Sequence, residues 1–123
     1  MKRDMELVRE VLLKLEELPP SSVVLGLPIS APRDVIDHHL WLLSDAGLMS
    51  GKRYPAKDEG DTWLVEGLTW TGHEFLDGIR DRSAWDRVKK TAVEKTGTLS
   101  FEAVREAIKF LVQIAFAAHG VGR

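Results

Sequence analysis

Six side chains between residues 33 and 57 have the chemistry to contact a nucleic acid. One predicted helix carries Arg33, His38 and Trp41, and the predicted hairpin after it carries three more cations, Lys52, Arg53 and Lys57. Lysine and arginine bind phosphates, and arginine also makes bidentate contacts with guanine. These residues predict a binding site for double-stranded DNA, with the hairpin cations on phosphates and the helix residues facing bases.

The charge around these residues opposes that function. Residues 31–79 contain four Lys/Arg against nine Asp/Glu, whereas residues 80–123 contain nine against five. A DNA-binding surface normally carries its basic patch on the element that enters the groove. The predicted recognition helix is instead acidic, so we expect any DNA binding to be weak and sensitive to salt.

Other kinds of site find little support in the sequence. The adjacent His38 and His39 point about 100° apart on a helix and cannot both bind one metal ion. His39 falls on the apolar side, where a core histidine bonded to backbone is expected. The chain has no cysteine, phosphate-binding loop, nucleophile elbow or zinc-protease motif. It predicts no enzyme, no metal site and no cofactor.

Composition indicates one globular domain over residues 1–123. The chain has average apolar and charged content, and the absence of cysteine is typical of a reducing cytoplasmic location. The N-terminus leads into a charged amphipathic segment rather than a signal peptide. The longest apolar run, residues 110–118, is far shorter than the ~20 residues that span a bilayer, so no membrane association is expected.

The helices and the extended segment before the hairpin are predicted from the spacing of apolar residues, and their ends from the positions of Gly and Pro. A helix begins after Asp4 and ends at Pro19-Pro20, with an apolar stripe of Met5, Val8, Val11, Leu12, Leu15 and Leu18. Residues 21–29 predict a short strand or an extended arm. The next helix is expected to be capped by Ser30 and to stop at Gly47. Its inner face is predicted to be Val35, Ile36, His39, Leu40, Leu43 and Ala46.

A hairpin and three helices are predicted in the rest of the chain. Residues 48–54 and 62–68 alternate as two strands around a polar tip. Thr69 or Thr71 caps a helix to about residue 81, and further helices span about 83–95 and 100–118. Trp63 and Trp70 are expected to close the hairpin over the core, and Trp85 to lie in a core. Trp41 either packs beneath a neighbouring segment or anchors an interface. The fold class is therefore mainly α with a small β hairpin.

Two resemblances to known protein families make the predicted fold more specific. The pattern His39-Leu40, Leu43 and Ala46-Gly47-Leu48 is similar to the recognition helix of bacterial winged-helix repressors. It implies a winged-helix-like core over residues 1–82, with two extra C-terminal helices over residues 83–123. The extended segment 21–29 departs from that pattern, because a helix-turn-helix needs a full helix there.

The second resemblance covers essentially the whole chain. Residues 1–9, the 39–48 pattern and residues 68–77 followed by Trp85 resemble a small prophage-associated family, domain of unknown function 2513. The resemblance implies a mobile-element origin and supplies no binding or catalytic residues.

The last helix predicts a homodimer. Its first apolar stripe can pack on the domain, and Val112, Ile114 and Phe116 extend apolar surface around the helix. The alternative is that residues 1–18 cover this surface within one monomer. Two functions therefore stay open: a DNA-binding regulator, and a protein–protein interaction module with a winged-helix shape.

Overall fold

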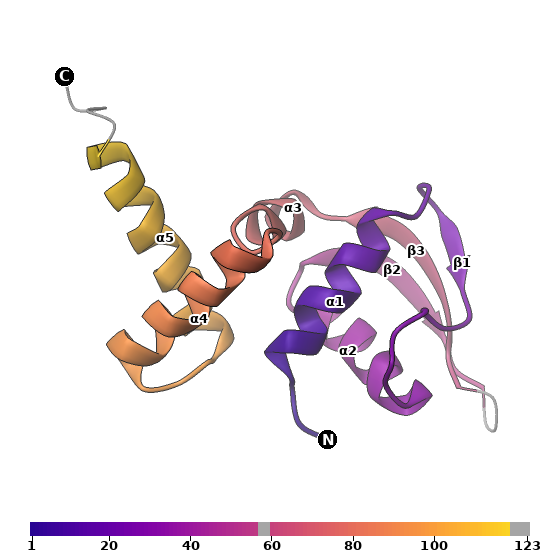
Figure 1. Cartoon of the computed structure of the whole chain (residues 1–123). Helices are drawn as coiled ribbons and strands as arrows, with labels where there is room; N and C mark the ends of the chain where they lie inside the picture. Colours follow the sequence, from indigo (N-terminus) through magenta and orange to yellow (C-terminus); the bar gives the residue numbers. More distant parts are fainter. Residues whose placement is uncertain (57–59, 119–123) are drawn as a thin grey trace. The chain divides into compact units, whose positions relative to one another are not determined.

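The computed structural model describes residues 1–56 and 60–118, which form five helices and one three-stranded antiparallel sheet (Figure 1). The chain divides into two compact units, Met1–Asp77 and Gly78–Arg123. The expected fold class, mainly α with a small β hairpin, is confirmed.

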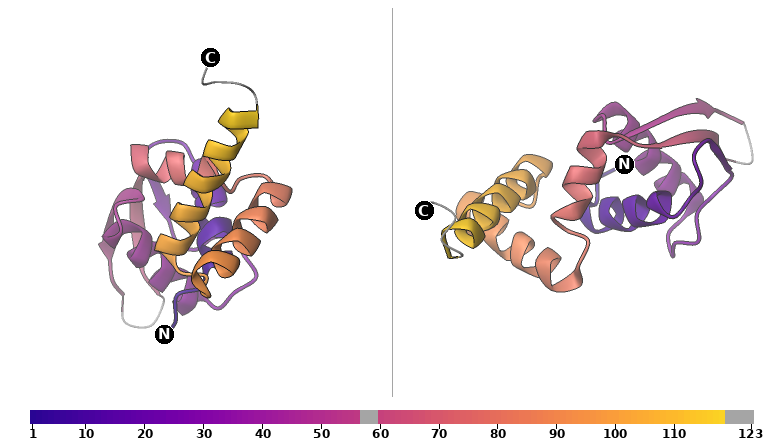
Figure 2. Two further views of the ribbon diagram at one scale, coloured as in Figure 1. Left: turned by 90° about the vertical axis from the view of Figure 1, so that its left-hand side faces the viewer. Right: turned by 90° about the horizontal axis from the view of Figure 1, so that it is seen from above.

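The first unit contains the sheet. Its elements in chain order are α1 (Met5–Glu16), β1 (Ser22–Val24), α2 (Arg33–Asp45), β2 (Met49–Tyr54), β3 (Thr62–Leu68) and α3 (Trp70–Asp77). β3 lies in the middle, paired with β1 on one side and β2 on the other. Residues 21–29 therefore supply a short strand, as expected, and it adds a third strand to the hairpin (Figure 2).

Helix α1 forms the centre of this unit. The Asp4 carboxylate caps it by accepting from the backbone N–H of Glu6. The helix packs against α2, β3 and α3, and its predicted apolar stripe is buried as far as Leu15. Leu18 lies beyond the end of the helix and is half-buried. The Pro19-Pro20 pair follows the end of the helix as predicted.

His39 ties the beginning of α1 to α2. The backbone N–H of Asp4 donates to Nε2 of His39 at 2.9 Å, and Nδ1 lies 2.8 Å from the carbonyl oxygen of Val35. Nε2 is therefore the acceptor, and Nδ1 carries the proton and donates it to Val35. The ring is fully buried. The expectation of a core histidine bonded to backbone is confirmed.

We expect the variant His39→Leu to lower the free energy of unfolding by about 1–3 kcal/mol, because the Asp4 N–H and the Val35 carbonyl lose their partner. Chemical denaturation measures the change. His73→Leu is the matched control, since His73 is exposed on α3 and its loss should have little effect. Equal stability of the two variants would contradict this account.

Helix α2 begins later than expected. Its N-cap is Pro32, without a side-chain cap, so the prediction that Ser30 caps it is wrong. The fixed φ of proline suits this boundary. Ile36, Leu40 and Leu43 are buried as expected, whereas Val35 is half-buried and Ala46 is exposed at the C-cap. Residues 25–32 form no helix, so a complete helix-turn-helix is missing and the winged-helix assignment stays a prediction.

Hydrogen bonds through Thr69 connect the end of α2 to the beginning of α3. The Thr69 hydroxyl donates to the carbonyl of Gly47 and accepts from the N–H of Gly72, and the Thr69 N–H donates to the carbonyl of Leu48. Thr69, not Thr71, therefore caps α3, which ends at Asp77 rather than near 81. The two sequence motifs around Gly47 and Gly72 meet here in one junction.

The second unit contains α4 (Arg82–Thr96) and α5 (Phe101–Ala118), which pack against each other. Asp81 caps α4, and hydrogen bonds from the Ser83 hydroxyl and the Ala84 N–H hold the pKa of its carboxyl below the usual value. Gly97 ends α4 in the left-handed conformation, and Ser100 caps α5. Trp85, Val88 and Ala92 of α4 are buried as expected.

Candidate functional site

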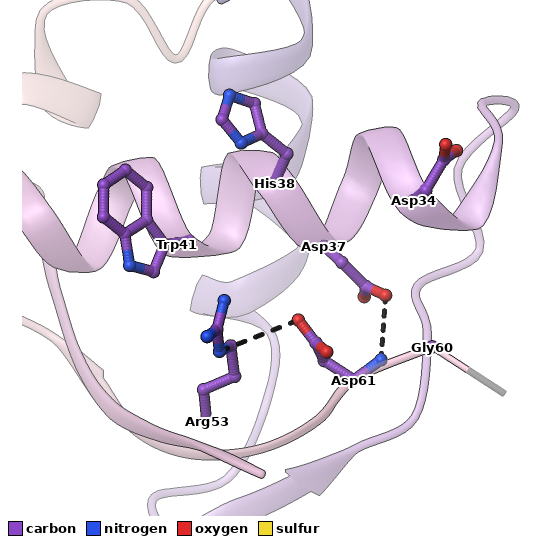
Figure 3. A pocket seen from close by; sticks show the side chains of 7 residues that line it. All are labelled: Asp34, Asp37, His38, Trp41, Arg53, Gly60 and Asp61. Atoms are coloured by element: carbon purple, nitrogen blue, oxygen red, sulfur yellow. Dashed lines mark hydrogen bonds and ion pairs between the residues drawn. The ribbon is translucent and has the colours of Figure 1, made fainter. Parts of the chain in front are cut away.

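A pocket of about 460 Å³ lies between the outer side of α2 and the β2–β3 hairpin (Figure 3). Helix α2 supplies three successive turns of side chains to it, and the hairpin supplies the opposite wall. The lining residues are Asp34, Asp37, His38, Trp41, Arg53, Gly60 and Asp61. Three carboxylates, two aromatic rings and one guanidinium group thus converge on one cavity.

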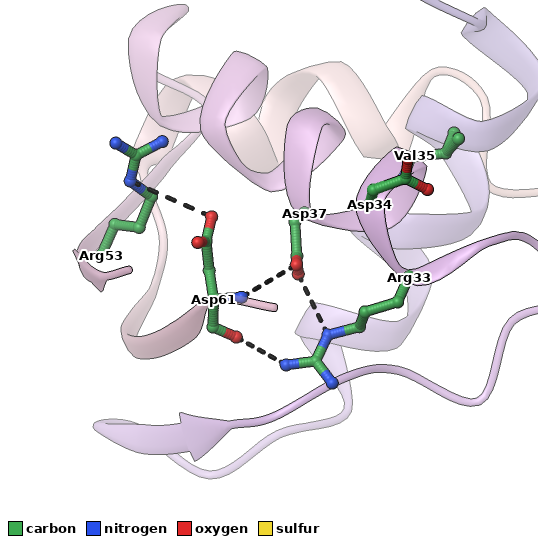
Figure 4. Close-up of polar contacts among 6 residues, drawn as sticks. All are labelled: Arg33, Asp34, Val35, Asp37, Arg53 and Asp61. Carbon is green, nitrogen blue, oxygen red and sulfur yellow. Dashed lines mark hydrogen bonds and ion pairs between the residues drawn. The ribbon is translucent and has the colours of Figure 1, made fainter. Parts of the chain in front are cut away.

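A hydrogen-bonded clamp fixes the base of this pocket (Figure 4). Arg33 donates from Nε to the Asp37 carboxylate at 3.3 Å and from Nη2 to the Asp61 carbonyl oxygen at 2.6 Å. The other Asp37 oxygen accepts from the Asp61 N–H at 3.0 Å. Asp37 is buried and both of its oxygens are used. The clamp therefore holds the beginning of β3 against the first turns of α2.

Gly60 permits this close approach. Its φ is +79°, and a Cβ at this position would lie 2.9 Å from the Asp37 carboxylate and 3.0 Å from the Arg33 side chain. A larger residue would push the hairpin away from α2 and would also be strained at this φ. The glycine therefore shapes the pocket wall without contributing a functional group.

Arg53, which lines the pocket, also lies near an acidic residue. Nε of Arg53 lies 4.0 Å from the Asp61 carboxylate. Both arginines predicted to contact DNA, Arg33 and Arg53, are thus engaged by acidic residues of the same face. The exposed Asp34 adds a further negative charge beside them.

An aromatic pair forms the other side of the pocket. The rings of His38 and Trp41 stack with centroids 6.2 Å apart and planes inclined by 15°. Trp41 remains 41% exposed, so packing inside the molecule covers only part of the indole. Trp41 therefore packs only in part against its neighbours, and its role as an interface anchor stays a prediction.

The six predicted residues do not form one surface. His38, Trp41 and Arg53 share the pocket, whereas Arg33 belongs to the clamp beneath it. Lys52 is exposed and lines a separate, smaller hollow with Gly51, Leu64 and Glu66. Lys57 lies outside the described residues.

Sequence reasoning finds Asp37 and Asp61 only as acidic neighbours, and Gly60 only as the turn glycine of the hairpin tip. The i, i+4 spacing of Arg33 and Asp37 is a usable signal, since such pairs face each other on a helix. No comparable signal points to Asp61, which joins the clamp through its backbone. The prediction for Trp70 is also wrong: it is 81% exposed, whereas Trp63 is buried as expected.

Two further features concern metal ligands and membrane-spanning helices. In the part of the chain that the structure describes, no three His, Cys, Asp or Glu side chains are grouped to hold a metal ion. Within the same residues, no helix is both long and apolar enough to cross a membrane.

Comparison with known proteins gives a family and one relative without a described activity. Residues 2–98 match the family described as "Hypothetical protein (DUF2513)". A protein of Haemophilus influenzae (strain ATCC 51907 / DSM 11121 / KW20 / Rd), named "Uncharacterized protein", is 33% identical over 115 residues, which cover 91% of this chain and 96% of the relative. No solved structure matches. The family match confirms the resemblance to domain of unknown function 2513 that the sequence indicated.

Proposed function

This chain belongs to the DUF2513 family of hypothetical proteins, and we propose that it acts by binding a protein partner at the α2–hairpin pocket rather than by catalysis. The observation that carries the proposal is that Arg33 is hydrogen-bonded to Asp37 and to the Asp61 carbonyl oxygen, and that the Asp61 carboxylate lies 4.0 Å from Arg53. Phosphates would have to compete with Asp37 and Asp61 for these arginines. An acidic, partly aromatic pocket remains.

The chemistry of the pocket fits a cationic side chain of the partner. Carboxylates form charge-assisted hydrogen bonds with lysine and arginine, and a tryptophan face attracts a cation placed above it. Asp34 and Trp41 are both exposed at the pocket. A partly exposed tryptophan in a cavity also has the character of an interface anchor.

Binding of a fluorescently labelled hexa-arginine peptide tests the proposal, with hexa-glutamate as the opposite-charge probe. We expect the arginine peptide to bind and the glutamate peptide not to bind. Trp41→Ala should weaken arginine-peptide binding about tenfold, because the stacking and cation–π face is lost. Trp70→Ala is the matched control and should bind as the unmodified protein does, since Trp70 is exposed outside the pocket.

Equal affinities of Trp41→Ala and Trp70→Ala for hexa-arginine would show that the peptide responds to overall charge and not to the pocket. That result would reject the proposed binding surface. Fluorescence anisotropy measures both affinities, and circular dichroism checks that both variants are folded.

DNA binding is a second candidate, favoured by the order of α2 and the following hairpin and by the exposed Lys52. We expect this binding to be weak. The logarithm of the binding constant falls with the logarithm of the salt concentration, and each neutralised phosphate adds about 0.9 to the steepness of that slope. The cations predicted to contact DNA are Arg33, Lys52, Arg53 and Lys57. The slope should be no steeper than about −4. Titration of labelled duplex at low and moderate salt measures it. Sequence-specific nanomolar binding at moderate salt would favour the DNA-binding regulator over the protein-binding module.

A further inference from the structure

The α2–hairpin pocket has two ends that differ in chemistry. Asp34, His38 and Trp41 line it from successive turns of α2, with Asp34 at one end and Trp41 at the other (Figure 3). The rise of an α-helix separates these two positions by about 10 Å along its axis. A ligand that fills the pocket therefore contacts two distinct surfaces.

The Asp34 end is suited to a cation. One Asp34 oxygen accepts from the N–H of Val35 at 2.9 Å, and the other makes no hydrogen bond or ion pair with a described residue. The other two carboxylates of the pocket lie beside guanidinium groups: both oxygens of Asp37 belong to the clamp, and the Asp61 carboxylate lies 4.0 Å from Arg53. Among the described lining residues, Asp34 therefore has the most capacity left for a basic side chain of the partner.

The Trp41 end is suited to an uncharged ring. Trp41 is 41% exposed, and the Arg53 side chain on the opposite wall is 45% exposed (Figure 3). An aromatic ring at this end would pack against the indole and would be attracted to the guanidinium group. A second cation would gain the attraction to the indole but would be repelled by Arg53. An aromatic side chain therefore fits this end better than a second basic one.

We infer, on the premise of the proposed function, that the partner presents an extended segment in which a Lys or Arg and an aromatic residue are three positions apart. The basic side chain binds at Asp34 and the ring at Trp41. In the polyproline II conformation, side chains return to the same side every three residues, and three residues advance about 9 Å. This advance is close to the separation of the two ends of the pocket.

The hairpin wall of the pocket is held in place by the clamp of Arg33, Asp37 and Asp61, which fixes the beginning of β3 against α2. A wall that is already ordered loses little conformational freedom on binding. We therefore expect affinity to depend on the spacing of the two side chains in the ligand as well as on its charge.

Two fluorescently labelled, amidated peptides of identical composition and charge test this spacing. Gly-Arg-Ala-Ala-Tyr-Gly places the two side chains three positions apart, and Gly-Arg-Tyr-Ala-Ala-Gly places them next to each other. We expect the first, spaced peptide to bind about three- to tenfold more tightly, because only its ring reaches Trp41 while its arginine stays at Asp34. Fluorescence anisotropy measures both affinities. Trp41→Ala should remove the difference between the two peptides.

Asp34→Asn tests the other end of the pocket. It should weaken binding of the spaced peptide by up to about fivefold, because the exposed ion pair with arginine is lost. It should not affect binding of Gly-Gln-Ala-Ala-Tyr-Gly, which has no cation. Asp45→Asn is the matched control, since Asp45 is exposed at the end of α2 and does not line the pocket. Circular dichroism checks that both variants are folded.

Equal affinities of the spaced and adjacent peptides, or no binding of either, would overturn the inference, as would equal effects of Asp34→Asn and Asp45→Asn. Hexa-arginine tests the proposed function separately. If Trp41→Ala weakens its binding and Trp70→Ala does not, while the two hexapeptides bind equally, the pocket is a binding surface but the spaced motif is wrong. If hexa-arginine does not distinguish the two tryptophan variants, the proposed function fails, and the spaced motif fails with it.

Discussion

Replacing Leu40 with alanine is expected to lower the free energy of unfolding of the first unit by about 2–5 kcal/mol. Leu40 is fully buried on the inner face of α2, so its removal leaves a cavity as well as losing the favourable transfer of its side chain from water. Urea denaturation measures the loss. A loss below about 1 kcal/mol would show that the site collapses around alanine without a cavity.

Leu25→Ala is the matched control for this prediction. The substitution is chemically identical, but Leu25 is 63% exposed in the segment after β1. Exposed substitutions of this kind usually change stability by no more than about 0.5 kcal/mol. The difference between the two variants therefore isolates the contribution of burial.

Gly72→Ala is expected to destabilise the first unit by about 3 kcal/mol or more, against the trend for helices, where alanine is favoured over glycine by about 1 kcal/mol. A Cβ on Gly72 would overlap the carbonyl oxygen of Leu48 and lie 2.9 Å from the carbonyl carbon. The obstacle is backbone at the junction of α2, β2 and α3, so it cannot rotate away. The first turn of α3 would have to move out of the junction.

Gly97→Ala provides the comparison for this second prediction. Gly97 has a φ of +76°, but no neighbouring atom lies within 4 Å of the position that an alanine Cβ would take, so only the left-handed conformation is strained. That strain costs about 1–2 kcal/mol. Thermal denaturation compares the two variants, and a Gly72→Ala protein as stable as Gly97→Ala would contradict the steric argument.

Local patterns predict most of the fold because each element satisfies a simple rule. The stripe of α1 repeats every three or four residues, the strands alternate around a polar tip, and the order of elements follows. The errors lie at boundaries. Ser30 has a capping side chain, yet the N-cap of α2 is Pro32, two residues later, because a proline disfavours the helical conformation at the residue before it, here Ala31.

The site is harder to predict because it depends on contacts across the chain. The sequence identifies Arg33 and Arg53 as cations near a groove, but it does not identify their partners. Asp61 reaches the Arg33–Asp37 pair from 24 residues beyond Asp37, and it reaches Arg53 from across the hairpin. Side-chain type shows that arginine can bind phosphate. Only the fold shows that Asp37 is hydrogen-bonded to Arg33 and that the Asp61 carboxylate lies near Arg53.

The division into two units has a spectroscopic consequence. Trp41, Trp63 and Trp70 belong to residues 1–77, and Trp85 is the single tryptophan of residues 78–123. Trp85 is fully buried, with the Lys89 ammonium 5.3 Å from the centre of its ring. Replacing the other three tryptophans with phenylalanine would leave tryptophan fluorescence that reports only on the unit formed by α4 and α5. Conversely, Trp85→Phe would leave the sheet-containing unit as the only source of tryptophan emission, so the melting of each unit could be recorded separately in the intact chain.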